Sequence, residues 1–303
     1  MEVLGTITLT EIMSQPKAWE KTINQVKDGV IRFPDIKYED YSRIFAVGSG
    51  SSYYLSMILR DLIAQQTPVP CFAVPSCEVF LSPATYFRHG QKYLVFVTSR
   101  SGRSTEALIA ASYLAENFNA DIVSLGCYPD SPLHQKAKYH LLAVAGQEKS
   151  VVMTRSFSTM LLTFELFHSL TIGADIGWAD ELSSLGTSLL ETYKGPLASL
   201  IDENDFEHFV CLGSGEFYGV AREAALKMEE MVIATSEAYH ALEYRHGPKS
   251  VASEKTLVVL FALPEEGDYQ LSLSRDLKAL GMTVIVVGEE KAVKKVSEVV
   301  DMP

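Results

Sequence analysis

A loop rich in hydroxyl groups, residues 98–105, has the composition of a phosphate site. It reads Thr-Ser-Arg-Ser-Gly-Arg-Ser-Thr, follows the apolar run 93–97 and leads directly into a helical pattern. Backbone N–H groups at a helix start, together with hydroxyl donors, bind dianions. Ordinary helix capping explains a single turn of this kind equally well, because Ser and Thr are common N-caps. The candidate phosphate-binding residues here are Ser99, Arg100, Ser101 and Ser104.

A second turn of the same kind, at residues 48–52, favours the phosphate interpretation. It reads Gly-Ser-Gly-Ser-Ser, follows another apolar run, and adds the candidates Gly50, Ser51 and Ser52. Both turns are expected at the carboxyl ends of parallel strands, where ligands of open α/β sheets bind. A dinucleotide is disfavoured, since Tyr53 stands where the third glycine of Gly-x-Gly-x-x-Gly would be.

Lys227, Glu230 and His246 are the candidate catalytic residues. Lys227 and Glu230 are three residues apart in a helical pattern, so they share one helix face. A solvated ion pair is the ordinary explanation for such charges. The following stretch, residues 235–249, is however dense in His, Glu, Arg, Lys and Tyr, and a Gly-Pro turn comes directly after His246. A lone histidine is more often structural, but one held at a rigid turn near a carboxylate can carry a proton.

Composition excludes several classes of partner. The chain has 303 residues, 47% of them hydrophobic, and a formal net charge of −12, which argues against nucleic acid and anionic membranes. Its four cysteines form no Cys-x-x-Cys pair, and no metal-ligand spacing is present, so neither a metal nor an organic cofactor is expected. No signal peptide or membrane span is recognisable, which predicts a cytoplasmic protein.

The strand and helix patterns predict an α/β fold. Residues 209–215 repeat the pattern of residues 44–50, a buried strand ending in Gly-Ser-Gly, and further apolar strands at 94–97 and 122–126 have counterparts at 259–262 and 284–288. Helical stretches separate these strands. Such alternation predicts two doubly wound parallel-sheet domains of flavodoxin-like type. The copies differ where the first has its hydroxyl loop, since residues 264–268 carry three acids that would repel a phosphate.

Taken together, the motifs resemble the sugar isomerase (SIS) family, which has two such domains in tandem. Within it, the chain resembles stand-alone amino-sugar-phosphate deaminases and isomerases of the AgaS and archaeal types, and the isomerase half of glucosamine-6-phosphate synthase. The resemblance covers nearly the whole chain and rests on the segments 48–52, 99–104, 151–157, 225–230, 236–239 and 243–249.

The resemblance implies roles for the candidates. Ser52, Ser99, Ser101 and Ser104 would hold a sugar phosphate, although Ser104 stands where Thr is usual. Glu230 would move a proton between C1 and C2 of the open-chain sugar, and Lys227 would orient Glu230 and the sugar. His246 would open the ring, often from the neighbouring subunit of a homodimer.

The expected function is therefore conversion of a 2-amino-2-deoxy-hexose 6-phosphate to a ketose 6-phosphate with release of ammonia, a direction favoured because no glutaminase half is encoded. The alternatives are an aldose-ketose isomerase, a fructosamine-6-phosphate deglycase, or a non-catalytic sugar-phosphate-binding regulator. The expected domains are an N-terminal helical segment (1–34), a phosphate-binding domain (35–175), a helical linker (176–200) and an acid/base domain (201–303). We expect this last domain to be short at its C-terminal end, without the lysine of the synthase-like tail.

Overall fold

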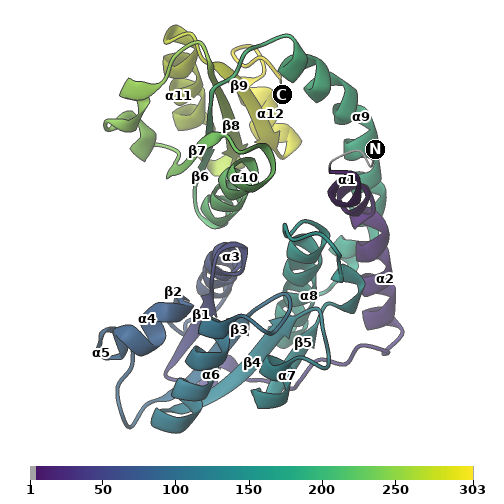
Figure 1. The fold of residues 1–303 in the computed structure, drawn as a ribbon, viewed down its shortest axis with the longest axis vertical. Helices are drawn as coiled ribbons and strands as arrows, with labels where there is room; N and C mark the ends of the chain where they lie inside the picture. The colour runs from purple at the N-terminus through teal and green to yellow at the C-terminus, as the bar shows by residue number, and fades with distance from the viewer. Residues whose placement is uncertain (1–4, 303) are drawn as a thin grey trace. The chain divides into compact units, whose positions relative to one another are not determined.

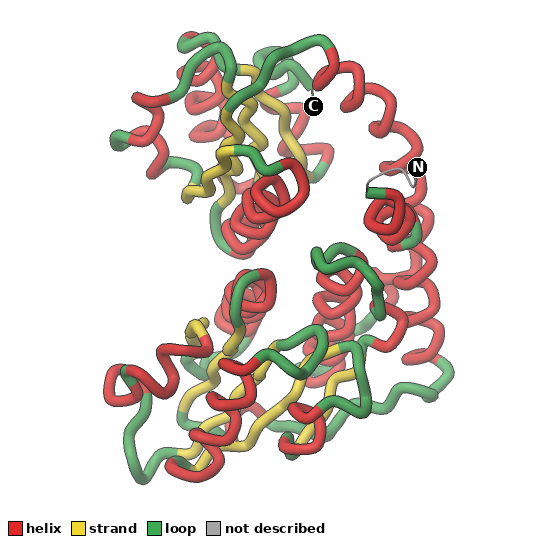
Figure 2. The backbone as a smooth tube through the Cα atoms, in the orientation of Figure 1, coloured by secondary structure: helices red, strands yellow, loops and turns green. Residues whose placement is uncertain are grey.

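The computed structural model describes residues 5–302, which divide into two compact units at Tyr193 and Lys194. Each unit contains one parallel β-sheet, of five and four strands respectively, so the chain has an α/β fold (Figure 1). Helices flank both sheets in the tube view (Figure 2). Within the described residues, no helix is both long enough and apolar enough to cross a bilayer.

The sheet of the first unit has the strand order β2-β1-β3-β4-β5, the flavodoxin-type order. Its strands are β1 (Arg43–Gly48), β2 (Cys71–Pro75), β3 (Lys92–Thr98), β4 (Asn119–Gly126) and β5 (Tyr139–Leu142). The register pairs Val47 of β1 with Val97 of β3, so these two strands end side by side. The turns that follow them therefore lie at the same edge of the sheet.

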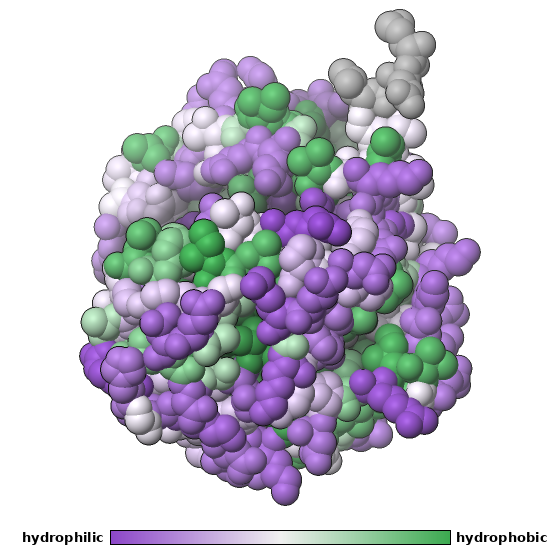
Figure 3. Space-filling view, turned by 60° about the horizontal axis from the view of Figure 1, so that its bottom comes forward, coloured by the Kyte–Doolittle hydropathy of each residue, from purple (hydrophilic) through white to green (hydrophobic). Residues whose placement is uncertain are grey.

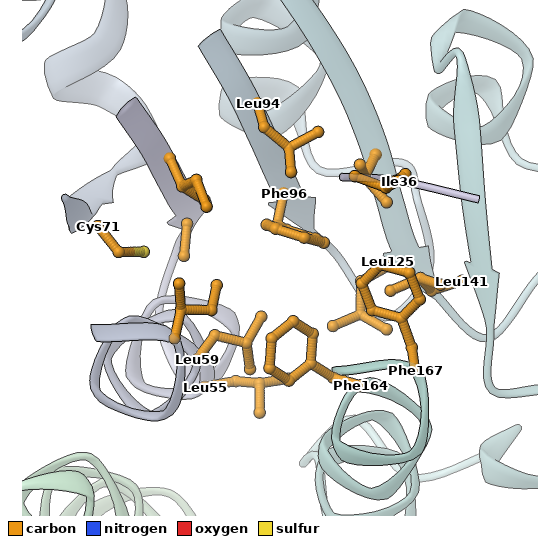
Figure 4. Packing of buried hydrophobic residues seen from close by; sticks show 14 of the residues in the cluster. Ile36, Leu55, Leu59, Cys71, Leu94, Phe96, Leu125, Leu141, Phe164 and Phe167 are labelled. Carbon is orange, nitrogen blue, oxygen red and sulfur yellow. The ribbon is translucent and has the colours of Figure 1, made fainter. Parts of the chain in front are cut away.

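The helices of the first unit pack on both faces of this sheet. They are α1 (Thr6–Met13), α2 (Gln15–Lys27), α3 (Ser51–Gln66), α4 (Ser76–Leu81), α5 (Pro83–Tyr86), α6 (Thr105–Asn117), α7 (Pro132–Lys136) and α8 (Arg155–Thr171). Leu55 and Leu59 of α3 and Phe164 and Phe167 of α8 cover one face (Figure 4). Apolar residues of α4, α6 and α7 cover the other.

The sheet of the second unit has the order β7-β6-β8-β9, which repeats the first order without a fifth strand. Its strands are β6 (His208–Gly213), β7 (Thr235–His240), β8 (Thr256–Ala262) and β9 (Thr283–Gly288). Its helices are α10 (Glu216–Val232), α11 (Gly267–Ala279) and α12 (Glu290–Val296), and α9 (Leu182–Asp202) runs across the division between the units. Apolar residues of α10 pack on one sheet face, and those of α11 and α12 pack on the other.

Strand residues alternate between the buried clusters on the two faces of each sheet. In β1, Ile44 and Ala46 face α3 and α8, whereas Phe45 and Val47 face the opposite cluster. This is why the strands read as continuous apolar runs: both of their faces are buried. On the face seen in Figure 3, hydrophilic residues predominate and hydrophobic ones form small separate groups.

A buried histidine in the first core predicts acid sensitivity. His168 of α8 is 3% exposed, its Nδ1 lies 3.0 Å from the Tyr38 hydroxyl, and its ring stacks on Phe164. Burial lowers the pKa of His168 to about 4. This folded-state pKa lies below the unfolded value. The contribution of His168 to the free energy of unfolding is therefore fully present above pH ~6.5 and is lost as the pH falls through the folded-state pKa. By pH 5 we expect the loss to reach about 2 kcal/mol of unfolding free energy.

Urea unfolding at pH 7.5 and pH 5 measures this effect. The His168→Gln variant is expected to lose less stability between the two pH values than the wild-type chain. Substitution of the exposed His89 by Gln serves as the matched control. An equal loss in wild type and His168→Gln would remove His168 as the source of acid sensitivity.

Candidate active site

The turn after β1 is a tight bend that ends in an uncapped helix start. Gly50 has φ 57°, a conformation that favours glycine, and α3 begins at the next residue without a side-chain cap. A Cβ on Gly48 would lie 2.3 Å from the Ser52 carbonyl oxygen, so the strand and the helix approach closely there. The side chains of Ser51 and Ser52 are buried at this helix start. The Ser52 and Tyr53 N–H groups donate to the carbonyls of Ser49 and Gly50 at 3.2 and 2.8 Å, and the positive end of the α3 dipole lies beside the two hydroxyls, where an anion is favoured.

The turn after β3 has the same features. Ser99 is 1% exposed, and its Oγ lies 3.2 Å from the Ser104 Oγ. Ser104 holds the N-cap position of α6 but makes no side-chain cap hydrogen bond there. The Ser101 Oγ instead accepts a hydrogen bond from the Arg103 N–H at 3.2 Å, which closes the loop. Gly102 has φ 60°, and a Cβ there would lie 2.1 Å from the Ser131 Oγ of the neighbouring loop.

The Ser56 hydroxyl connects the two turns. Ser56 of α3 donates to the Ser52 carbonyl at 2.8 Å and to the Thr98 Oγ1 at 3.4 Å. Thr98 ends β3 and is buried, so this contact ties α3 to the start of the second turn. The structure thus brings the hydroxyls of Ser52, Ser99 and Ser104 to one edge of the sheet.

The Arg100 side chain points away from the hydroxyl cluster of Ser52, Ser99 and Ser104. Its Nη1 donates to the Glu148 Oε1 at 3.2 Å and to the carbonyls of Ser150 and Val151 at 3.1 and 3.0 Å. The guanidinium is therefore engaged with the segment before α8 rather than with the hydroxyl cluster. Glu148 is a residue that the sequence did not single out, because nothing in its local pattern marks it as Arg100's partner.

The candidate acid/base residues of the second unit begin with an ion-pair cluster near the end of α10. The Lys227 Nζ lies 2.5 Å from the Glu230 Oε2 and 3.1 Å from the Glu223 Oε1, so one ammonium bridges two carboxylates. The side chain of Glu230 is 38% exposed, whereas that of Glu223 is 9% exposed. The spacing of four residues between Glu223 and Lys227 could have revealed this second partner in the sequence.

His246 lies in a loop after β7 and is exposed. It follows the 3-10 turn Glu243–Arg245, to which its N–H donates at 3.0 Å, and precedes Gly247, whose φ of 126° favours glycine. The next 3-10 turn starts at Pro248. The backbone around His246 is therefore fixed on both sides while the ring remains accessible.

Glu230 and His246 lie at opposite ends of the strands of the second sheet, one where β7 begins and the other where it ends. β6 and β7 are parallel and α10 is the crossover between them, so the end of α10 lies where β7 begins. Glu230 precedes the start of β7, and His246 follows its end. Since β7 has six residues, about 16 Å of strand separates the two edges. Within this unit, then, the carboxylate and the imidazole do not meet.

The turn after β8 carries acids in place of hydroxyls. Residues 264–266 form a 3-10 turn, and Gly267 begins α11. Asp268 pairs with Lys295 at 2.7 Å, and this ammonium lowers the pKa of the carboxyl. The described residues contain no cluster of three or more His, Cys, Asp or Glu side chains arranged to hold a metal ion.

The SIS domain family matches residues 37–170 and 204–294, one stretch in each unit. The chain belongs to this family of sugar isomerase domains.

Among the proteins to which the chain is similar are two curated relatives and one solved structure. A D-galactosamine-6-phosphate deaminase of Escherichia coli is 29% identical over 310 residues, covering 95% of this chain and 79% of that protein. A glutamine–fructose-6-phosphate aminotransferase (isomerizing) of Fusobacterium nucleatum is 28% identical, covering 97% of this chain and half of that enzyme. The crystal structure of a glucosamine-6-phosphate deaminase from Thermotoga maritima superposes with a TM-score of 0.81 at 28% identity, covering 97% of this chain and 95% of that one.

Proposed function

We propose that this chain is a cytoplasmic amino-sugar 6-phosphate deaminase/isomerase that converts a 2-amino-2-deoxy-hexose 6-phosphate to a ketose 6-phosphate and ammonia. The observation that carries the proposal is the pair of uncapped helix starts, α3 and α6, lined by buried hydroxyls at one edge of the first sheet. Similarity to deaminases named for two hexosamine 6-phosphates supports the substrate class.

In this proposal the two units are tandem doubly wound domains with separate tasks. The first, residues 35–175, binds the phosphate at the start of α3, beside Gly50, and through the hydroxyls of five serines, which are Ser51, Ser52, Ser99, Ser101 and Ser104. Arg100 takes part through its loop backbone, since its guanidinium contacts Glu148. The second domain, residues 201–303, supplies the groups that act on C1 and C2. Phosphate binding far from the reacting carbons positions them.

The chemistry that the acid/base residues would perform is a proton transfer followed by hydrolysis. His246 assists ring opening to the free aldehyde. Glu230 then removes the C2 proton, which gives an enolamine, and returns a proton to C1, which gives a 2-imino sugar. Water adds to the C=N carbon and ammonia leaves, so the products are the ketose phosphate and ammonia. Lys227, between two carboxylates, holds Glu230 in place.

We propose further that the active enzyme is a homodimer in which His246 comes from the second copy. The placement of Glu230 and His246 at opposite edges of one sheet supports this arrangement, because one unit alone does not bring them together. The helix α9 adds support: its exposed apolar residues recur every fourth position, which is a pattern typical of a covered helix face. These residues are Leu185, Leu189, Tyr193, Leu197 and Ile201.

An ammonia assay tests the proposed activity. The purified chain is incubated separately with glucosamine 6-phosphate and galactosamine 6-phosphate, and ammonia and ketose 6-phosphate are measured together. Equal amounts of the two products from either substrate are expected. Ketose formation from an aldose 6-phosphate, with no ammonia from either amino sugar, would support a plain isomerase instead. Binding without turnover of any of these sugars would support a regulator.

Loss of one cradle hydroxyl is expected to weaken substrate binding. The variant Ser99→Ala removes a buried donor, and hydrogen bonds to charged groups contribute about 1.5–3 kcal/mol, so KM should rise about tenfold or more with little change in kcat. Steady-state kinetics on the amino sugar phosphate measures this effect. Ser42→Ala, at an exposed hydroxyl before β1 and at the other edge of the same sheet, is the control. Unchanged KM in Ser99→Ala would exclude this hydroxyl from the phosphate site.

A further inference from the structure

A fully buried carboxylate lies behind the proposed phosphate loop. The Glu148 side chain is 0% exposed and stands in the segment that connects β5 to α8. Its Oε2 accepts hydrogen bonds from the Thr154 N–H, the Thr154 hydroxyl and the Ser156 N–H, each at 3.2 Å. Its Oε1 accepts from the Ser156 hydroxyl and from Arg100. Five donors thus converge on one carboxylate at the start of α8, where a negative charge is favourable.

Arg100 connects this carboxylate to the loop 99–104. Its Nη1 also donates to the carbonyls of Ser150 and Val151, so the guanidinium fixes the backbone two and three residues after Glu148. The Arg100 carbonyl in turn accepts from the Cys127 N–H at 2.9 Å, which anchors the same residue to the turn after β4. Arg100 is therefore held at both ends, by its side chain and by its backbone.

A second buried carboxylate extends the network to the N-terminal helix. Glu11 of α1 is 5% exposed and accepts from the N–H groups of Lys149 and Ser150 at 2.5 and 3.1 Å. The Thr8 and Ser150 hydroxyls lie 2.9 Å apart, which adds a second tie between α1 and this segment. The segment that holds Arg100 is thus itself held from α1.

Two guanidinium groups balance the two carboxylates. Arg155 lies 3.9 Å from Glu11 and donates to the Ser14 hydroxyl and to the Gln147 carbonyl. Arg100 plays the corresponding role for Glu148. A buried carboxylate left without such partners would be strongly disfavoured. The network directs the Arg100 guanidinium to Glu148 and to the carbonyls of Ser150 and Val151 rather than to the hydroxyls of its own loop.

We propose that Glu148 is a positioning residue for substrate binding: by holding Arg100, it fixes the shape of the loop that grips the phosphate, and Glu11 supports it from α1. This inference rests on the proposed phosphate-binding role of the loop. Without the Glu148 charge, the freed guanidinium competes for the hydroxyls and carbonyls of its own loop. The phosphate then meets a distorted cradle, while the groups that act at C1 and C2 are untouched.

Three variants test the proposal: Glu148→Gln, Arg100→Lys and Glu11→Gln. Each is expected to raise KM for the amino sugar phosphate, and the Kd for inorganic phosphate, by about 10- to 100-fold, the range usual for partners behind a binding site. The value of kcat should stay within about threefold of wild type, since only the remote grip is altered. Glu20→Gln, at an exposed carboxylate of α2, is the matched control and should leave both constants unchanged.

A double variant shows whether Glu148 acts through Arg100. The combination of Glu148→Gln with Arg100→Lys should raise KM no more than the larger single effect, because both changes break one unit. Thermal unfolding monitors folding of each variant, and Arg100→Lys retains a charge for Glu148 if Glu148→Gln fails to fold. Multiplying effects, or a fall in kcat with unchanged KM, would overturn the proposal. If the wild-type chain binds neither inorganic phosphate nor a hexose 6-phosphate, the proposed function fails instead.

Discussion

Replacing Glu230 by Gln is expected to abolish turnover while leaving substrate binding intact. The amide is nearly isosteric with the carboxylate but cannot accept the C2 proton, and general-base catalysis contributes about 10²- to 10⁴-fold. We therefore expect kcat to fall by about that factor. The dissociation constant for the amino sugar phosphate, measured by titration calorimetry, should change little because the phosphate cradle lies in the first unit.

The adjacent residue offers a matched control. Glu229 is exposed on the same helix one position away, and Glu229→Gln should keep wild-type kinetics. Exchange of the C2 proton with deuterated solvent gives an independent measure of the same step, since it reports proton abstraction even when ammonia release is slow. Wild-type exchange and wild-type kcat in Glu230→Gln would exclude this carboxylate from the mechanism.

Mixing two inactive variants should restore activity. Glu230→Gln and His246→Asn, each made separately, are unfolded together and refolded so that subunits exchange. A mixed dimer then has one site with both residues intact, if His246 serves the neighbouring copy. Because half of randomly paired dimers are mixed and one of their two sites is complete, about a quarter of wild-type activity should return.

The double variant Glu230→Gln/His246→Asn, refolded with either single variant, is the control for this experiment. In either mixture, every copy carries a substitution at the same one of the two residues. No site can then contain both an intact Glu230 and an intact His246, so activity should stay low. Activity that fails to return in the first mixture, in material shown to be dimeric by light scattering, would mean that Glu230 and His246 act within one copy. A monomer in that measurement would rule out the dimer itself.

The buried strands were predictable because both of their faces are covered. β1, β3, β4, β6, β8 and β9 appear in the sequence as apolar runs. The sequence did not predict β2, β5 and β7. β2, β5 and β7 all lie at sheet edges, β5 has only four residues, and β7 reads Thr-Ser-Glu-Ala-Tyr-His with most positions partly exposed. An edge strand has one neighbour only and needs less apolar surface, so its pattern is often weak. β9 is the exception among the edge strands, because it reads Thr-Val-Ile-Val-Val-Gly and its outer side bridges to Met302.

The candidate site also has a part that could be predicted from the sequence and a part that could not. The turns at residues 48–52 and 98–105 are local features, in which glycine conformation and helix starts follow from adjacent residues, and they could be predicted. The contact between Arg100 and Glu148 joins residues that are 48 positions apart, and no local pattern encodes it. Arg100 was therefore expected at the phosphate, whereas the fold directs its side chain into a buried ion pair.

The glycines at the two Gly-Ser-Gly bends have a consequence for saturation mutagenesis. A methyl group at Gly48 or at Gly213 would collide with a main-chain oxygen, at 2.3 and 2.2 Å respectively. Both positions should therefore reject every other amino acid in a growth selection, although only the first bend is proposed to contact substrate. Intolerance at these two glycines would reflect the close packing of strand and helix, not substrate binding. The serines that follow Gly48 are the positions at which such a screen distinguishes substrate recognition from folding.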